Sequence, residues 1–213
     1  MALNSRGLRE ALRLIVITDS GLAAPRPVEV VVEAALRGGA RAIQLRDKAA
    51  PPRALLAQAH LLRELTRAWG GLLFINDRFD IALAARADGV HLGPGDLPVA
   101  AVRRVAPPGF LIGHSTDVPD VARAAVKEGA DYIGCGAVFP TTTKRDAGTV
   151  IGVSGLARVV DSVAVPVVGI GGVTAEGARE IAEGSGAAGV AAIGAVMGAR
   201  NPEEAVRELL ASQ

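Results

Sequence analysis

Polar residues gather where one short apolar run of the sequence ends, at residues 42–48, which read AIQLRDK. Successive side chains of a strand point to opposite faces, so Gln44, Arg46 and Lys48 would share one face and the apolar residues the other. Two cations and an amide on one face could hold a diphosphate and orient a heterocycle. The alternative is an ordinary surface pair between Arg46 and Asp47 at a strand end.

Two aspartates follow the next two apolar runs. Asp77 comes directly after Asn76 at the end of LLFIN, and Asp96 ends the segment HLGPGD. Carboxylate oxygens suit Mg²⁺, which commonly takes one or two of them and completes its shell with water and phosphate oxygens. Asp77 and Asp96 are therefore predicted Mg²⁺ ligands. The alternative is that Asn76 and Asp77 cap the helix that follows, and that Asp96 starts another helix.

Hydroxyl groups follow two later runs. Ser115 ends the segment GHS and could donate a hydrogen bond to a pyrophosphate oxygen, or it could help to cap the next helix. The loop FPTTTK at residues 139–144 carries the hydroxyls of Thr141 and Thr143 and the cation of Lys144. Lys144 could neutralise a developing negative charge, although three threonines are also typical of a solvated loop.

Glycines follow the last two apolar runs. The pair Gly171 and Gly172 lets a phosphate approach backbone N–H groups closely, and Gly194 and Ala195 belong to the partner loop. Phosphate sites formed after strands seven and eight recur in barrels. This pair of loops predicts a phosphorylated ligand without identifying it.

The remaining reactive residue types favour structural roles. His60 lies in a helical pattern, and His91 and His114 sit near strand ends, too scattered for a metal site. Cys135 lies inside an apolar strand and is expected to be a small core residue. The motifs G-x-S-x-G, H-E-x-x-H and Walker A do not occur in the sequence.

Short apolar runs alternate with amphipathic segments along the chain, so the polar clusters stand at regular positions. The apolar runs, typical of buried parallel strands, are residues 13–18, 42–46, 72–76, 89–92, 110–114, 131–137, 166–170 and 188–193. The helical patterns are residues 28–36, 53–68, 99–105, 118–128, 175–183 and 202–210.

Eight such units without a linker predict a single (β/α)8 TIM barrel domain over residues 1–213. An open doubly wound sheet is the alternative, but its first turn would carry G-x-G-x-x-G, and the sequence there reads TDSGLAAP. In a barrel the polar strand ends would meet at one rim, where active sites form.

Composition limits the partners that we expect. Twenty-three basic and twenty-two acidic residues give a net charge of +1, so we expect no nucleic acid and no membrane surface as a partner. One cysteine excludes an intrachain disulfide and fits a reducing cytoplasm. The N-terminal residues lack the apolar core of a signal peptide, and no run is long enough to span a bilayer. We expect a cytoplasmic protein that forms a homo-oligomer.

The ordered series of motifs resembles the thiamine phosphate synthase family. The matching segments are QLRDK (44–48), INDR (75–78), VHLG (90–93) with Asp96, GHS (113–115), PTTTK (140–144) and GIGGV (169–173). The resemblance implies a transferase that joins 4-amino-5-hydroxymethyl-2-methylpyrimidine diphosphate to 4-methyl-5-(2-hydroxyethyl)thiazole phosphate. Mg²⁺ is the implied cofactor, and pyrophosphate and thiamine phosphate are the implied products.

The resemblance also implies a role for each position. The residues implied to bind the pyrimidine diphosphate and its leaving pyrophosphate are Gln44, Arg46, Lys48, Ser115 and Lys144, with Arg46, Ser115 and Lys144 implied to be catalytic. Asp77 and Asp96 would hold Mg²⁺, with Asn76 close by. The residues implied to bind the thiazole phosphate are Thr141, Thr143, Gly171, Gly172, Gly194 and Ala195.

A few positions depart from the family pattern and define the rival hypotheses. Ile15 stands where a Tyr is frequent, Pro94 and Gly95 replace a more polar pair, Asp117 stands where a His is frequent, and Gly194 replaces a common Ser. A thiazole tautomerase would need an acid–base residue such as that His. A non-catalytic thiamine phosphate-binding barrel would not need both aspartates, and a phosphosugar enzyme would leave residues 44–48 and 140–144 without a role.

Overall fold

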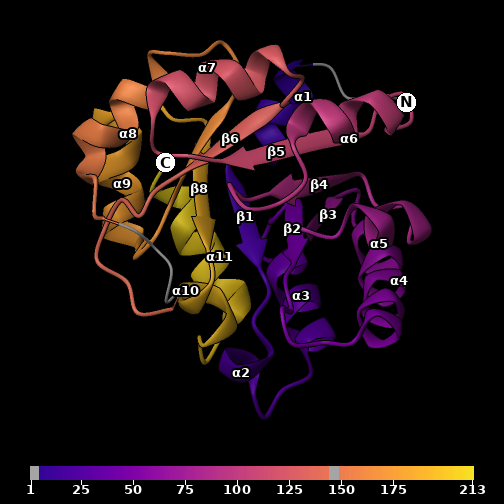
Figure 1. Cartoon of the computed structure of the whole chain (residues 1–213). Coiled ribbons are helices and arrows are strands. Elements are labelled where there is room, and N and C mark those ends of the chain that lie inside the picture. The colour runs from indigo at the N-terminus through magenta and orange to yellow at the C-terminus, as the bar shows by residue number, and fades with distance from the viewer. Residues whose placement is uncertain (1–4, 144–148) are drawn as a thin grey trace.

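The computed structural model describes residues 5–143 and 149–213, and its strands close into a parallel barrel in the order of the chain (Figure 1). The predicted (β/α)8 barrel is thus confirmed. The strands are β1 (Leu14–Ile17), β2 (Ala42–Leu45), β3 (Leu72–Asn76), β4 (Gly89–Leu92), β5 (Leu111–Ser115), β6 (Tyr132–Cys135), β7 (Val167–Ile170) and β8 (Gly189–Ala192).

Helices surround the barrel, and the short α2 and α10 lie together at one of its ends (Figure 1). The helices are α1 (Ser5–Ala11), α2 (Ser20–Ala23), α3 (Val28–Arg37), α4 (Pro52–Ala68), α5 (Phe79–Ala84), α6 (Val99–Val105), α7 (Pro119–Lys127), α8 (Gly152–Val160), α9 (Ala175–Gly184), α10 (Gly194–Met197) and α11 (Pro202–Ala211). Among the described residues, none of these helices combines the length and the apolar character that a membrane crossing requires.

The strands are buried on both faces, which explains why they read as continuous apolar runs rather than as alternating ones. Their outer side chains pack under the helices, and their inner side chains fill the barrel. Phe74 of β3 and Tyr132 of β6 meet inside it edge to face, with ring centroids 5.3 Å apart. The interior is therefore a packed core that opens only at its ends.

The predicted elements agree with the structure except at some ends and in some short helices. β5 runs one residue further than expected, because Ser115 still pairs with Gly134 of β6. The predicted strand 131–137 ends at Cys135 instead. The sequence patterns do not predict α1, α2, α5, α8 or α10. For α8, two glycines in GVSGLARVV weaken the helical signal.

Two partly buried aspartates tie the strands together at the amino-terminal end of the barrel. Asp88, just before β4, accepts hydrogen bonds from Leu73 N of β3 at 2.8 Å and from the Arg63 guanidinium of α4 at 2.5 and 3.0 Å. Asp131, just before β6, repeats this arrangement two strands later with Ile112 N and Arg103, at 2.7 and 2.5 Å. Each Arg–Asp clamp joins a helix to two adjacent strands.

We predict that Asp88→Ala lowers the free energy of unfolding by about 3 kcal/mol, because it leaves a strand N–H and a mostly buried guanidinium without their acceptor. Urea denaturation measures this loss. Asp120→Ala is the matched control, since Asp120 forms an exposed pair with Arg123 and should change stability by less than about 0.5 kcal/mol. Equal losses in both variants would contradict the clamp.

Candidate active site

Two adjoining cavities open at the carboxyl ends of the strands. The smaller, about 40 Å³, lies at the barrel axis, and the larger, about 330 Å³, extends under the loops after β6, β7 and β8. They share the lining residues Ser115, Gly134, Ile170, Ala191 and Ile193. A ligand in one cavity would therefore touch a ligand in the other.

The end of β2 brings Gln44 and Arg46 to the smaller cavity. Gln44 is only 2% exposed, and Arg46 is partly buried. Lys48 is exposed, but its charge and that of Arg46 reach Asp77 and act to lower the pKa of that carboxyl. Asp47 accepts hydrogen bonds from Ala49 N and Ala50 N, and the described part of the chain shows no ion pair between Arg46 and Asp47.

Thr18, which follows β1, holds Arg46 in place. Its buried hydroxyl accepts a hydrogen bond from Arg46 N at 2.9 Å and donates one to Arg46 O at 3.2 Å. The sequence analysis assigned Thr18 no role. Its signal was weak but present, since Thr18 is the polar residue at the end of the run RLIVIT.

Asp77 and Asp96 meet as predicted from their positions after neighbouring strands. Their side chains are in hydrogen-bonding contact, and burial followed by the neighbouring Asp96 raises the pKa of Asp77 to about 6. Asp77 adopts a left-handed backbone with φ of 62°, and its N–H donates to His91 O at 2.8 Å. Asp96 is oriented by Gly93 N, which donates to its carboxylate at 2.6 Å.

Neither aspartate caps a helix, so the capping alternative is wrong. The cap position of α5 is Arg78 and that of α6 is Pro98, both without a side-chain cap bond. Two adjacent carboxylates that repel each other form a favourable site for a hard divalent cation. The described residues contain no cluster of three or more His, Cys, Asp or Glu side chains suited to a metal, so such an ion would need further oxygen ligands.

Ser115 also does not cap a helix, and it belongs to a buried polar chain instead. Its hydroxyl lies 2.7 Å from His91 Nε2, and His91 Nδ1 lies 2.9 Å from the hydroxyl of Tyr132. Burial raises the pKa of Tyr132 well above its ordinary value, so this hydroxyl keeps its proton. The prediction that His91 has only a structural role is therefore incomplete, because it contacts a residue that lines both cavities.

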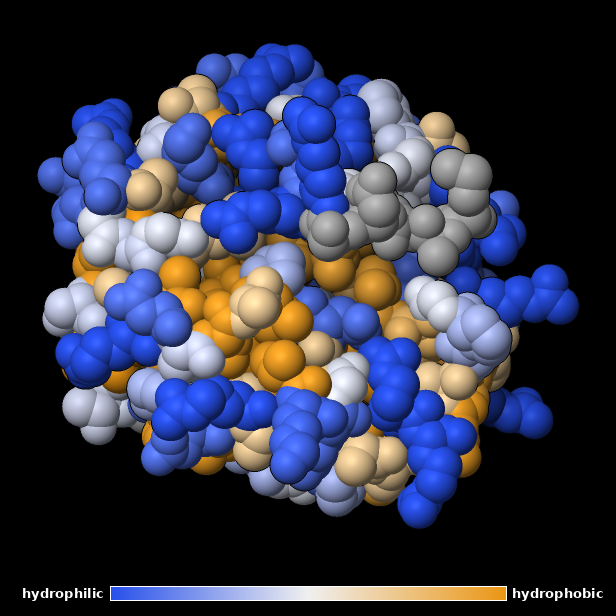
Figure 2. Space-filling model, turned by 90° about the horizontal axis from the view of Figure 1, so that it is seen from above, coloured by the Kyte–Doolittle hydropathy of each residue, from blue (hydrophilic) through white to orange (hydrophobic). Residues whose placement is uncertain are grey.

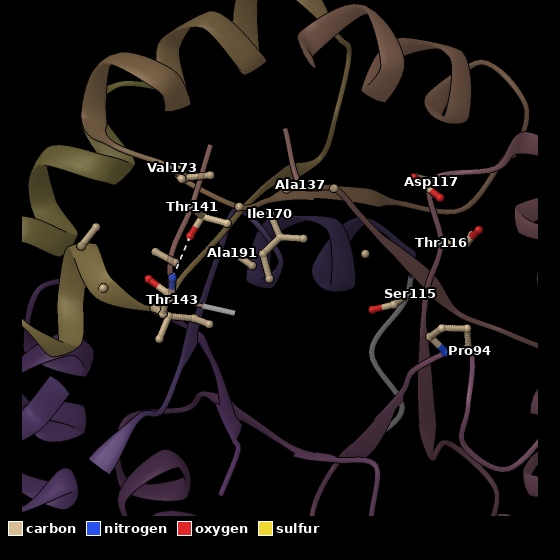
Figure 3. A pocket seen from close by; sticks show the side chains of 18 residues that line it. Pro94, Ser115, Thr116, Asp117, Ala137, Thr141, Thr143, Ile170, Val173 and Ala191 are labelled. Carbon is tan, nitrogen blue, oxygen red and sulfur yellow. Dashed lines mark hydrogen bonds between the residues drawn. The ribbon is translucent and has the colours of Figure 1, made fainter. Parts of the chain in front are cut away.

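The larger cavity separates Ser115 from the hydroxyls of the loop after β6 (Figure 3). Thr141 and Thr143 lie on its opposite side, and Thr143 N donates to Thr141 Oγ1 at 3.2 Å. The predicted glycines after β7 and β8 line the same cavity, with Ala195 at the first turn of α10. Lys144, the remaining predicted residue of this loop, lies outside the described residues.

Gly171 and Gly172 are required by the backbone conformation of this loop. Their φ angles are 101° and 63°, which side chains rarely adopt. A Cβ on Gly171 would lie 2.7 Å from Ala137 Cα, and one on Gly172 would overlap Pro140 O. The glycine pair lets the loops after β6 and β7 pack together, and this contact shapes the cavity wall.

The positions that depart from the expected family pattern also line the cavities. Ile15 lies in the smaller cavity, and Pro94 and Asp117 lie in the larger one. His60 is exposed, as expected of a surface residue. Cys135 is buried, and burial raises the pKa of its thiol to about 12, which agrees with a core residue.

Comparisons with known proteins identify close relatives of this chain. The family model described as thiamine monophosphate synthase matches residues 14–196. A thiamine-phosphate synthase of Pyrococcus furiosus is 48% identical over 95% of both chains. One of Roseiflexus castenholzii is 47% identical over 91% of this chain and 85% of its own length.

Solved structures give the same result. A thiamine phosphate pyrophosphorylase from Pyrococcus furiosus superposes with a TM-score of 0.88 at 46% identity, over 96% of both chains. A 3-hexulose-6-phosphate synthase has a TM-score of 0.67 at 18% identity over 94% of this chain and 99% of its own, which reflects the shared barrel alone.

We predict that the pKa of Asp77 in the metal-free protein falls from about 6 toward its ordinary value in Asp96→Asn, which removes the neighbouring charge. Because the folded pKa is raised, protonation of Asp77 stabilises the fold at pH below 3.8, and this contribution disappears as pH rises through about 6. Carbon-13 NMR of the Asp77 carboxyl group measures the pKa directly.

Asp80→Asn is the control for this titration, because the exposed Asp80 pairs with Arg78 rather than with Asp77. An Asp77 pKa that shifted equally in both variants would show that Asp96 is not its cause.

Proposed function

The chain belongs to the thiamine monophosphate synthase family, and from this premise we propose which of its residues carry out the family's reaction. The enzyme is a transferase of thiamine biosynthesis. It joins the pyrimidine diphosphate to the thiazole phosphate, releases pyrophosphate and forms thiamine phosphate. The pair of adjoining cavities carries the assignment, because the side chains proposed for the two substrates meet at one barrel mouth.

The pyrimidine diphosphate would bind at the mouth of the smaller cavity, whose interior of about 40 Å³ cannot enclose the whole substrate. Gln44 is the buried amide at the cavity wall and would orient the heterocycle. Arg46 and Lys48 would bind the diphosphate, to which the guanidinium of Arg46 can donate two parallel hydrogen bonds. Ser115 would hold the leaving pyrophosphate where the two cavities join. Lys144 is proposed to contact the same group.

Asp77 and Asp96 would hold Mg²⁺, with Asn76 as a neighbouring oxygen donor. The neighbouring Asp96 helps to raise the pKa of Asp77, which reflects repulsion between the two carboxylates. This repulsion supports the proposal, since a divalent cation would relieve it. When bound, the ion would neutralise charge on the diphosphate and on the departing pyrophosphate. Asp77 and Asp96 would orient the ion, and Gly93 N and His91 O fix these two residues through their own hydrogen bonds.

The larger cavity would bind the thiazole phosphate. Thr141 and Thr143 offer hydroxyls, and the turns after β7 and β8 offer backbone N–H groups around a recurring phosphate position of barrels. The residues proposed for this phosphate are Thr141, Thr143, Gly171, Gly172, Gly194 and Ala195. At Gly194 the contact would come from the backbone.

The reaction needs positioning and charge stabilisation rather than a general base. The bond between the pyrimidine methylene and the diphosphate oxygen breaks, and pyrophosphate leaves with the electron pair. The amino group of the ring stabilises the resulting cation, and the thiazole nitrogen then supplies the electron pair of the new C–N bond. Arg46, Lys144 and Ser115 would stabilise the charge that develops on the leaving group.

The rival activities receive no support from the site. A tautomerase would need an acid–base residue such as the His that is frequent at residue 117, and this chain has the exposed Asp117 there instead. We further propose that residues 1–213 act as one catalytic domain in the cytoplasm. Figure 2 shows hydrophobic residues gathered within a hydrophilic rim on one face, which supports the proposed homo-oligomer.

We predict that the purified protein forms thiamine phosphate and pyrophosphate in equal amounts, and only when Mg²⁺ is present. Asp77→Asn and Asp96→Asn should each lower kcat by about a hundredfold or more, because each removes a charged metal ligand. A coupled pyrophosphate assay measures the rates. Asp120→Asn, far from these ligands in an exposed pair, should keep the full rate. Full activity after chelation of divalent cations would refute the metal assignment.

We also predict that Thr141→Val and Thr143→Val each raise KM for the thiazole phosphate about tenfold, the effect of one lost hydrogen bond to a charged group. The KM for the pyrimidine diphosphate should stay constant, because that substrate would lie in the other cavity. Steady-state kinetics with each substrate varied in turn tests this. Increases in both KM values would place the threonines outside a separate thiazole phosphate site.

A further inference from the structure

A chain of four polar side chains runs through the interior of the barrel and connects two residues of the proposed pyrimidine site. The side chain of Gln44 of β2 interacts with that of Tyr132 of β6 and acts to lower the pKa of Tyr132. The Tyr132 hydroxyl lies 2.9 Å from His91 Nδ1 of β4, and His91 Nε2 lies 2.7 Å from Ser115 Oγ of β5. Gln44 and Ser115 line the smaller cavity, so the chain begins and ends at the proposed ligand.

The neighbouring strands leave room for this chain. Gly113 of β5 faces it, and a Cβ there would overlap the Tyr132 ring and lie 2.5 Å from His91 Nδ1. At Gly134 of β6 a Cβ would lie 3.0 Å from His91 Cε1. Tyr132 is fully buried and His91 is 9% exposed, so water competes little for their polar atoms.

A neutral imidazole has one donor and one acceptor nitrogen, so the chain can run in two directions. In one direction the Gln44 amide donates to Tyr132, Tyr132 donates to His91 Nδ1, and His91 Nε2–H donates to Ser115 Oγ. The hydroxyl proton of Ser115 is then available to the cavity. In the opposite direction Ser115 donates to His91, and Tyr132 donates to the Gln44 carbonyl, so Ser115 offers only lone pairs to a ligand.

The charge of the proposed ligand favours the first direction, in which the Gln44 amide donates to the phenolic oxygen of Tyr132. The proposed ligand at Ser115 is an anion, which attracts a hydroxyl proton and repels lone pairs. The same direction leaves the carbonyl oxygen of Gln44 as the acceptor for an amino group.

We propose that Tyr132 and His91 are positioning residues that fix Ser115 as a hydrogen-bond donor to the leaving pyrophosphate and Gln44 as an acceptor for the pyrimidine amino group. This inference rests on the proposed function of the two end residues. The chain thereby couples recognition of the ring to stabilisation of the leaving group, although neither Tyr132 nor His91 needs to touch the diphosphate.

The first test reads the direction of the chain in the ligand-free protein. Nitrogen-15 NMR of the histidine rings should show His91 protonated at Nε2 and unprotonated at Nδ1. In Tyr132→Phe the Nδ1 resonance should shift, because its hydrogen-bond donor is gone. A ring protonated at Nδ1, alone or together with Nε2, would overturn the proposal. This result does not depend on catalytic activity, so it stands apart from the test of the proposed function.

The second test asks whether Tyr132 acts through Ser115. Tyr132→Phe should lower kcat/KM for the pyrimidine diphosphate about tenfold, while the KM of the thiazole phosphate stays constant. In a Ser115→Ala background the same substitution should cost about threefold or less, the part that acts through Gln44. Equal losses in both backgrounds would overturn the proposal.

Thr66→Val is the matched control for loss of a buried hydroxyl. Thr66 is fully buried in α4, and its hydroxyl donates to Arg63 O at 3.1 Å. This variant should lose stability but keep kcat/KM, whereas Tyr132→Phe should lower kcat/KM at temperatures where both variants remain folded. Equal kinetic losses in the two variants would reduce the role of Tyr132 to stability and overturn the proposal.

Discussion

The closed parallel ladder is the constraint on which the rest of the molecule depends. Parallel strands joined by helices all point the same way, and a ladder that closes on itself brings eight carboxyl ends to one rim. Residues from 15 to 195 along the chain therefore line two adjoining cavities. The short strands can be almost wholly apolar because chemistry is required only of the residues at their ends.

Much of the fold and of the rim could be predicted from the sequence because both depend on local patterns. Alternation along β2 and into the residue that follows it places Gln44 and Arg46 on the inner side. The meeting of Asp77 with Asp96 follows from strand adjacency. The alternatives that failed were also local ones. A helix-capping role was an equally good prediction for Asn76, Asp77 and Ser115, but α5 and α7 begin a few residues later.

The interior chain could not be predicted in this way, because it depends on register across several strands. Tyr132 reads as part of an apolar run, and His91 reads as an isolated histidine between Val90 and Leu92. Only the paired strands show that both point inward, toward a space that Gly113 and Gly134 leave open. For the same reason the hydrogen bonds of Thr18 to Arg46, which join β1 to β2, were not expected.

The Arg–Asp clamps stand at the end of the barrel opposite to the chemistry. Asp88 and Asp131 tie strand beginnings, whereas substrates would meet only strand ends. The residues that stabilise the fold and the residues that would determine specificity thus lie at opposite ends of the barrel. Loops at the carboxyl ends of the strands can change while the Arg–Asp clamps at the opposite end preserve the barrel. This separation allows the same fold to accept new substrates.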